Sequence, residues 1–353
     1  MKKSLSLVLS IALTATMLTA CAGKSNDAGN TTTEQTTAPV TTEAAAAKTG
    51  LAVTSSIAKS TNVGDTDGLA EIDSTVVAVL VDQDGKILDC KIDAVQTKVN
   101  FSAEGKLTTD IATVIKSKQE LGTEYGLGAK SAIGKEWNEQ VNALADYVVG
   151  KTAAEVKGIT VTEEGVATEA DLTSSVTIKI GDYLAAIDKA VTNAQDLGAT
   201  TADILGLATT TDIAKSTDAT ADADGIAQAY SFYAAVTKGV DGKITSCAID
   251  ASQGSVNFNT KGAITSDLTV APQTKQELKD AYGMKANSAI GKEWYEQANA
   301  FASYVKGKTV DEVKGIAVSE EGLATDADLI SSVTVHIGPF ITIVKKAATN
   351  AVK

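Results

Sequence analysis

The alternation of apolar and polar positions predicts a β-hairpin followed by a long amphipathic helix. Residues 76–81 are apolar and mostly β-branched, and residues 87–94 alternate, with the turn residues Asp84-Gly85 between the two runs. Two such runs around an Asp-Gly turn are typical of a hairpin. Residues 131–149 then have apolar side chains at helical spacing, and Gly150 ends the predicted helix.

Two shorter helices are predicted after the long one. Thr152-x-x-Glu155 has the spacing of a capping box, which opens a helix. Residues 185–191 form a closing helix. Because strands and helices are segregated along the chain and the hairpin is antiparallel, we expect the α+β class, with an antiparallel sheet packed with helices.

The same pattern occurs a second time. Residues 131–151 and 288–308 are identical at 16 of 21 positions, and the offset of 157 residues holds without a gap from residue 67 to residue 190. A unit of this length is a whole domain, since solenoid repeats run about 20–50 residues. We therefore expect two similar tandem domains, at residues 50–196 and 206–353, each long enough to bury a core.

Residues 1–20 are predicted to be a signal peptide. Lys2 and Lys3 precede an apolar stretch over residues 5–18, which ends in Leu18-Thr-Ala-Cys21. This motif resembles the lipobox of bacterial lipoproteins, which implies cleavage before Cys21 and a diacylglyceryl group on its sulfur. An ordinary signal peptide with a chance cysteine is the alternative.

Residues 21–49 are predicted to form a flexible tether. They are rich in Thr, Ala, Ser and Glu, and they show no apolar period, so they cannot bury a core. The lipoprotein resemblance implies that the lipid on Cys21 anchors the chain to the cell membrane. The two domains are then expected on the extracytoplasmic face.

Composition excludes several classes of function. The formal net charge is −13, and all 31 basic residues are lysines. An acidic chain without arginine, whose guanidinium suits phosphates and base edges, is not suited to nucleic acid. The single histidine, His336, and three widely separated cysteines provide no metal site, nor a histidine-based catalytic triad in each domain.

One short motif, present in both copies, points to a cofactor. Asp171-Leu-Thr-Ser-Ser-Val-Thr177 recurs as Asp328-Leu-Ile-Ser-Ser-Val-Thr334, and each copy leads into the closing helix. The motif resembles the signature of the bacterial FMN-binding domain family, Asp-x-x-Ser-Gly-Ala-Thr before a helix. In that family a flavin transferase joins FMN to the threonine through a phosphate ester. Such domains often occur in tandem on lipoproteins and carry electrons outside the membrane.

By position, the resemblance assigns FMN binding to four residues in each copy. They are Asp171, Ser174, Ser175 and Thr177, and in the second copy Asp328, Ser331, Ser332 and Thr334. The family glycine is a serine in both copies, and the following alanine is a valine, which restricts the backbone and adds bulk beside the threonine. A second interpretation needs no cofactor: residues 174–180 alternate like a strand, and Asp182 caps the closing helix.

Other prominent side chains are expected in structural roles. Cys90 and Cys247 lie on the inward face of a predicted strand, where we expect buried, unpaired thiols. Trp137 and Trp294 lie on the apolar face of the long helix and are expected in the core. Gln140 lies at a surface-like position of the same helix, where it lines a groove or interacts with charged neighbours.

Two functions follow as alternatives. The first is a membrane-anchored extracytoplasmic lipoprotein that binds FMN and carries electrons to an extracytoplasmic redox partner. The second is a cofactor-free surface binding or structural module of the same fold. Either is favoured over an enzyme, because the sequence contains no nucleophile elbow, metal site or carboxylate dyad.

Overall fold

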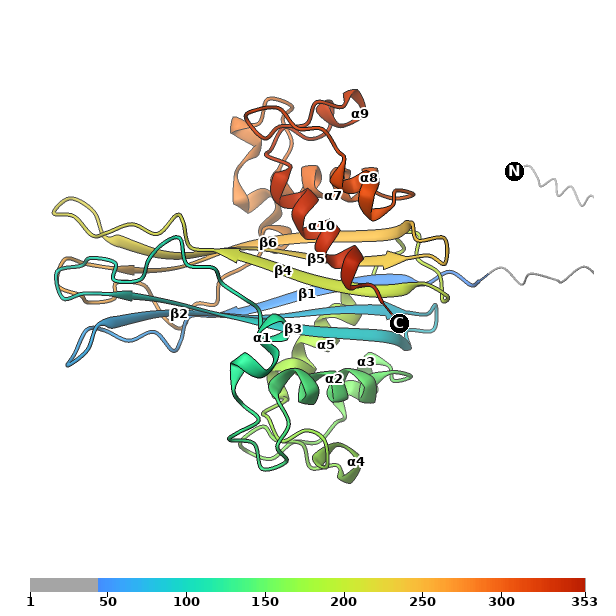
Figure 1. The fold of residues 1–353 in the computed structure, drawn as a ribbon, viewed down its shortest axis with the longest axis horizontal. Coiled ribbons are helices and arrows are strands. Elements are labelled where there is room, and N and C mark those ends of the chain that lie inside the picture. Colours follow the sequence, from blue (N-terminus) through green and yellow to red (C-terminus); the bar gives the residue numbers. More distant parts are fainter. Residues whose placement is uncertain (1–43, 353) are drawn as a thin grey trace, which may run out of the picture. The chain divides into compact units, whose positions relative to one another are not determined.

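The computed structural model describes residues 44–352, which belong to one compact unit, Ala44–Lys353. The predicted signal peptide, Cys21 and most of the predicted tether lie outside the described residues. None of the helices described is long and apolar enough to cross a membrane. The compact unit contains both repeats, each a three-stranded sheet followed by helices (Figure 1).

Both repeats have the same order of elements. The first contains β1 (Lys48–Ser56), β2 (Gly68–Val81), β3 (Ile87–Phe101), α1 (Lys118–Leu121), η1 (Gly122–Tyr125), α2 (Trp137–Val148), α3 (Ala153–Lys157), α4 (Ala170–Thr173) and α5 (Gly181–Thr192). The second contains β4 (Ile204–Asp212), β5 (Gly225–Lys238), β6 (Ile244–Phe258), α6 (Lys275–Leu278), η2 (Lys279–Tyr282), η3 (Lys285–Asn287), α7 (Trp294–Tyr304), α8 (Val310–Lys314), α9 (Ala327–Ile330) and α10 (Gly338–Asn350). The predicted α+β class is confirmed.

Each sheet is an antiparallel meander with its second strand in the centre. The strand orders are β1-β2-β3 and β4-β5-β6. β2 pairs with β3 from Gly68↔Phe101 to Val81↔Ile87, and the predicted Asp84-Gly85 turn joins them. The predicted hairpin is therefore confirmed, and its strands are longer than the apolar runs indicated. β1 adds the third strand, which the sequence pattern did not predict.

The two sheets face each other, and helices cover the outer face of each sheet (Figure 1). Along β2, Val77 and Val79 pack with the helices of their own repeat, whereas Val76 and Ala78 pack against the opposite sheet. A strand that is buried on both faces needs apolar side chains at consecutive positions. This double burial explains why the apolar run of β2 has no polar position.

The long helix begins later than its pattern predicts. α2 starts at Trp137, because Gly134 adopts φ +66° and turns the chain before it. The Glu139 carboxylate accepts a hydrogen bond from the Glu136 N–H at 2.7 Å, which closes the first turn. The expected apolar face is buried from Trp137 to Val148, and the predicted start at residue 131 is wrong.

Two phenylalanines stack where the sheets meet. Phe101, at the end of β3, and Phe258, at the end of β6, are fully buried, with ring centroids 4.2 Å apart and planes inclined by 8°. Gly68 and Gly225 lie against these rings, and a Cβ at either position would come within 2.4 Å of a ring carbon. Glycine at these two strand positions therefore makes room for the stack.

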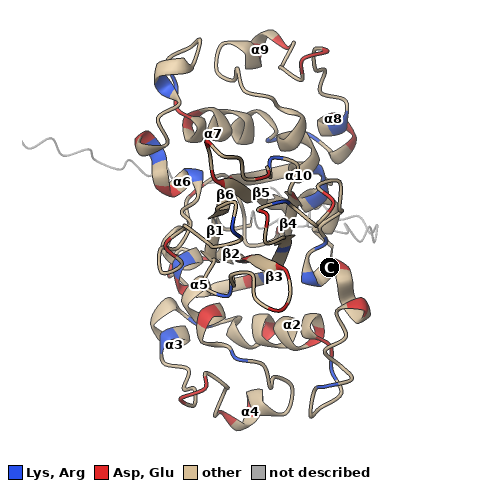
Figure 2. Cartoon of the chain, turned by 90° about the vertical axis from the view of Figure 1, so that its left-hand side faces the viewer, with Lys and Arg blue, Asp and Glu red and all other residues tan. Residues whose placement is uncertain are grey.

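Two ion pairs between the repeats form a matched pair. Lys189 on α5 forms an ion pair with Glu277 at 2.6 Å, and Lys346 on α10 forms one with Glu120 at 2.7 Å. Each lysine also donates to a carbonyl in the first strand of its own repeat. In Figure 2, which looks along the strands, the helices of the two repeats lie on opposite sides of the paired sheets. The repeats thus form one unit with near-twofold symmetry.

Replacing Phe101 or Phe258 by alanine is expected to lower the free energy of unfolding by about 3–5 kcal/mol, because each ring fills a buried space between the sheets. The double variant should lose less than the sum of the single losses, since stacking contributes about 0.5–1.5 kcal/mol beyond burial. Urea unfolding followed by circular dichroism measures both effects. Strictly additive losses would contradict a direct contact between the rings.

Candidate functional site

The residues assigned to FMN lie in α4 and in the loop between α4 and α5. Asp171 and Ser174 are exposed, and Ser175 and Thr177 are half-buried. The second copy lies in α9 and the loop before α10. There Asp328 and Ser331 are exposed, and Ser332 and Thr334 are half-buried. The structure therefore groups the four residues of each copy, with the threonine shortly before a helix.

The strand interpretation of residues 174–180 is wrong. The chain turns after α4 and continues as a loop, with one isolated bridge to Val166. Val176 and Ile180 are fully buried in the core beneath the helices, so the alternation comes from a loop that points every second side chain inward. Asp182 does not cap α5, because Ile180 occupies the N-cap position, and it does so without a side-chain hydrogen bond.

A buried glutamine holds each motif loop. The Oε1 of Gln140 accepts hydrogen bonds from the N–H of Thr177 at 2.8 Å, from its hydroxyl at 3.1 Å and from the N–H of Ile178 at 3.2 Å. Its amide nitrogen donates to Ser131 and to the carbonyl of Lys135. Gln140 is completely buried, so the prediction of a surface position is wrong. Gln297 makes the equivalent contacts with Thr334.

The two motif loops form separate sites. α4 and α9, which precede them, lie at opposite ends of the compact unit in both Figure 1 and Figure 2. The two threonine hydroxyls therefore belong to different ends of the molecule. Two cofactors, one bound at each loop, would therefore be separated by both sheets.

The cysteines and tryptophans have the structural roles expected for them. Cys90 and Cys247 are buried, unpaired thiols, and burial raises the pKa of Cys247 to about 12. A thiol held protonated in this way is not a nucleophile at neutral pH. Trp137 and Trp294 are buried in the cores beneath the helices, and the indole N–H of Trp137 donates to the Tyr183 hydroxyl at 3.0 Å.

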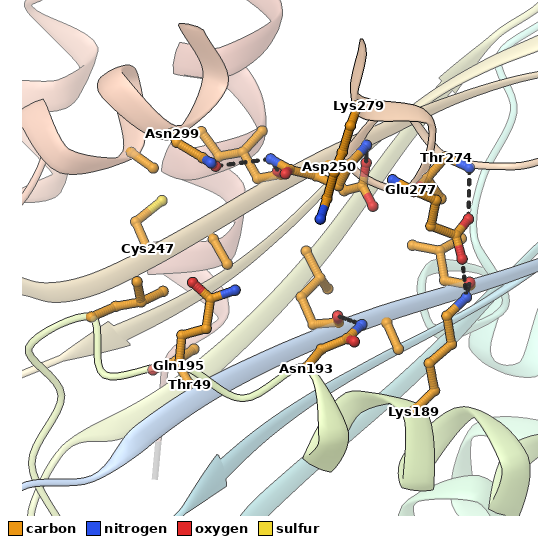
Figure 3. Close-up of a pocket in the computed structure, with 18 of the residues that line it drawn as sticks. Thr49, Lys189, Asn193, Gln195, Cys247, Asp250, Thr274, Glu277, Lys279 and Asn299 are labelled. Carbon is orange, nitrogen blue, oxygen red and sulfur yellow. Dashed lines mark hydrogen bonds and ion pairs between the residues drawn. The ribbon is translucent and has the colours of Figure 1, made fainter. Parts of the chain in front are cut away.

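A cavity of about 590 Å³ lies between the repeats (Figure 3). The first repeat contributes β1, the end of α5 and the connector that follows it, through residues such as Asn193 and Gln195. The second repeat contributes β6, α6 and α7, through residues such as Asp250 and Asn299. The volume is within the range of small-molecule sites, which often form between domains. We take this inter-repeat cavity as the principal candidate site.

One wall of the inter-repeat cavity is a fixed polar network. The Oδ1 of Asp250 accepts hydrogen bonds from the N–H of Ala251 at 2.7 Å and from the N–H of Gln276 at 3.1 Å. The Gln276 amide donates to the Asn299 side chain at 2.9 Å and to the Ile249 carbonyl at 3.0 Å. Burial raises the pKa of Asp250 to about 7. This wall is therefore held rigidly whether or not anything occupies the cavity.

Lysines outnumber carboxylates in the lining of the inter-repeat cavity. The charged lining residues are Lys189, Lys279, Lys306, Asp250 and Glu277. Lys189 and Glu277 neutralise each other in the ion pair between the repeats. Within the described residues, Lys279 and Lys306 form no ion pair. The cavity is therefore locally positive in a chain whose net charge is −13.

Lys279 has a backbone conformation that favours glycine. Its φ is +47° and its ψ is −120°, and it is the one non-glycine residue with positive φ in the described part of the chain. The equivalent residue of the first repeat is Gly122, with φ +48° and the same ψ. A side chain at such a position costs about 1–3 kcal/mol. The Lys279 side chain extends into the inter-repeat cavity (Figure 3).

The near-twofold symmetry relates the inter-repeat cavity to an equivalent position between the repeats, and the residues there differ from those that line the cavity. The offset of 157 residues places Gly122 at the position of Lys279, Lys91 at that of Ala248, and Val149 at that of Lys306. Lys91 is engaged there by Asp89 at 3.1 Å. The near-twofold symmetry therefore holds for the fold but not for the side chains of the inter-repeat cavity.

A buried lysine, Lys275, lies beside this site on α6, whereas Lys279 is exposed. The ammonium of Lys275 donates to the Tyr230 hydroxyl at 2.8 Å and lies 4.5 Å from the ring centroid of Tyr282 and 5.1 Å from that of Trp294. Burial lowers the pKa of Lys275 to about 8. These aromatic contacts stabilise the cation within the core. Lys275 does not line the inter-repeat cavity, and we assign it a structural role.

Sequence reasoning did not identify the inter-repeat cavity. Two signals were present: Lys189 and Asn193 recur as Lys346 and Asn350, and Lys279 stands where the first copy has glycine. The recurring lysines form the ion pairs between the repeats. The recurring asparagines act within their own repeat, where the Asn193 and Asn350 side chains donate to carbonyls of β1 and β4. The non-recurring residue marks where the two sides of the molecule differ.

Comparisons with known proteins give one partial match. No family model matches the chain. A curated protein from Desulfitobacterium hafniense, named chlorophenol reductase, is 60% identical over 42 residues, which are 12% of this chain and 13% of that protein. No solved structure matches. The chain thus spans a small fraction of the relative it matches, and this match does not show a family.

The stability of the protein should depend on the protonation of Asp250. Its pKa of about 7 in the folded state lies above the value of 3.8 for a free side chain, so the folded protein binds a proton that the unfolded chain releases. This residue therefore favours folding below about pH 4, and its contribution is lost as the pH rises to about 7. Asp250→Asn should remove that loss and unfold at higher urea than the parent at pH 8.

The matched control is Asp93→Asn in the first repeat. Burial raises the pKa of Asp93 to about 6, so its effect should be complete at a lower pH than that of Asp250. Urea midpoints measured between about pH 4 and about pH 8 test both variants. If the curves of parent and Asp250→Asn run parallel over this range, Asp250 is not the group that titrates.

Proposed function

We propose that this protein is a membrane-anchored extracytoplasmic binding protein that holds a small molecule in the inter-repeat cavity. The proposal combines the lipobox-like motif at Cys21, the tether that follows it and the compact pair of repeats. The single observation that carries the binding role is the cavity of about 590 Å³ with a lining drawn from both repeats. A lipid-anchored module of this kind would present its ligand site outside the cell.

The lining of the inter-repeat cavity supports a binding role. Apolar side chains such as Leu51, Val53 and Ile249 lie beside amides and lysines, a combination typical of small-molecule sites. The network around Asp250 is satisfied internally, so it fixes the wall without needing a ligand. The remaining polar groups are then available to orient a bound molecule.

A bulky side chain at the mouth of the inter-repeat cavity should abolish binding. Ser303 is exposed on α7 and lines the cavity, so Ser303→Trp should fill it with little effect on folding. As probes we suggest anilinonaphthalene sulfonate and its neutral analogue N-phenyl-1-naphthylamine, whose fluorescence rises on transfer from water to an apolar site. The parent should bind one equivalent of dye, and Ser303→Trp should bind at least about tenfold more weakly.

Asp146→Trp is the matched control. Asp146 is the exposed residue equivalent to Ser303 on α2, outside the inter-repeat cavity, so its replacement should leave dye affinity unchanged. The same urea midpoint for the three proteins would show that the dye does not report partial unfolding. Equal dye affinity in the parent and Ser303→Trp would refute the inter-repeat cavity as the binding site.

FMN binding with electron transfer is the second candidate function. One observation favours it: Thr177 and Thr334 are half-buried residues in loops before helices, rather than in a sheet. The curated protein that matches 42 residues of this chain is named chlorophenol reductase, and a reductase carries out redox chemistry. Bound FMN would supply one- and two-electron transfer, for which an extracytoplasmic redox partner would be needed.

The residues of the motif loop are compatible with a phosphate ester on Thr177. Forming the ester removes the hydroxyl proton and with it the hydrogen bond to Gln140, while the N–H groups of Thr177 and Ile178 still hold the loop. The exposed Ser174 leaves one side of the loop open. The bulky Val176 points into the core, so it does not obstruct that side.

Covalent FMN can be tested by mass spectrometry. Protein produced together with a flavin transferase should give peptides that contain Thr177 or Thr334 with the added mass of esterified FMN. Thr177→Val should remove the adduct from the first peptide only, since the two loops are separate sites. Unmodified peptides from both loops, in a host that flavinylates a control substrate, would exclude covalent attachment.

A further inference from the structure

We propose that the inter-repeat cavity selects small organic anions, whose carboxylate, phosphate or sulfonate group is bound by the ammonium of Lys279. The inference rests on the proposed binding function and names the chemical class of its ligand. One such anion site is expected in each chain, although the near-twofold fold contains two equivalent positions.

The charge balance of the lining is the first argument. Lys189 and Glu277 cancel in their ion pair, and Asp250 directs an oxygen at two backbone N–H groups. Lys279 and Lys306 then give the cavity its positive charge. The ammonium of Lys306 donates to the Leu197 carbonyl at 3.2 Å, so it is partly engaged by the connector. A positive recess in an acidic protein attracts an anion and disfavours a cation.

The strained backbone of Lys279 is the second argument. Gly122 shows that this turn forms equally well with glycine, because its φ and ψ match those of Lys279. The Lys279 side chain therefore costs stability, and it is exposed and forms no ion pair within the described residues that would offset the cost. Strain of this kind is typical of functional positions. The lysine points into the cavity, where an anion would neutralise it (Figure 3).

Other donors are placed to complete an anion site. The side-chain amide of Gln195, on the connector, points into the inter-repeat cavity from the wall opposite Lys279 (Figure 3). The half-buried Leu51 also lines the cavity, and its apolar side chain suits the carbon skeleton of an organic anion. The ligand is thus expected to have one anionic group and an apolar body, rather than to be a free inorganic ion.

The equivalent position in the other half lacks these groups. It has Gly122 in place of Lys279, and Lys91, which is paired with Asp89, in place of Ala248. Gln195 belongs to the connector between the repeats, and its counterpart by the offset is Val352. One anion per chain is therefore expected.

The experiment compares two dyes that differ only in a sulfonate. The parent protein should bind anilinonaphthalene sulfonate about tenfold or more tightly than the neutral N-phenyl-1-naphthylamine, since a hydrogen bond to a charged group contributes about that factor. Lys279→Gly should remove this preference, and Lys279→Arg should keep it. Lys279→Gly should also raise the melting temperature, because glycine relieves the strain, so any lost affinity is not due to unfolding.

The outcomes separate this inference from the proposed function. If both dyes bind the parent and Lys279→Gly equally, and Ser303→Trp still blocks them, the cavity binds ligands but does not select anions by Lys279. If neither dye binds in a way that Ser303→Trp blocks, the proposed function and this inference both fail. Two equivalents of the sulfonate dye per chain, bound with equal affinity, would contradict the single site.

Discussion

The packing of one sheet on the other is the constraint on which the structure depends. Each sheet has three strands and is apolar on both faces, and its own helices cover only one of them. The second face, with Val76 and Ala78 of β2, must be covered by the other repeat. A single repeat would expose that face to water, which favours association or aggregation. A second sheet is therefore needed to cover this face, and the tandem duplication supplies it within one chain.

Near-twofold pairing also explains which side chains the two copies share. Some contacts that hold the repeats together use the same residue twice, as in the ion pairs of Lys189 and Lys346. Positions outside those contacts are free to differ without disturbing the packing. Lys279 and Gly122 differ in this way while their backbones remain the same. On the proposed function, specialisation of the duplicated fold is expected at residues that break its symmetry.

The parts of the fold that depend on local sequence were predictable, and the parts that depend on tertiary contacts were not. The Asp84-Gly85 hairpin and the Thr152 capping box are local signals, and both are present. Residues 174–180 alternate like a strand, but the alternation comes from a loop packed on the core. Gln140 was expected at the surface because its sequence position shows no sign of the loop that buries it. No periodic pattern in the sequence indicates which faces of the two sheets pack against each other. The inter-repeat cavity, which depends on that packing, was therefore not predictable.

The fold gives the motif threonines, Thr177 and Thr334, a structural role, but it gives none to Lys279. Gln140 offers one oxygen to three donors of the Thr177 loop, and Gln297 does the same for Thr334. A hydroxyl that helps to anchor a loop has a structural reason to occur in both copies, with or without a cofactor. Lys279 has no such partner among the described residues and occupies a backbone conformation that opposes it. For this reason the asymmetric residue, rather than the repeated motif, is the stronger indication of where a ligand binds.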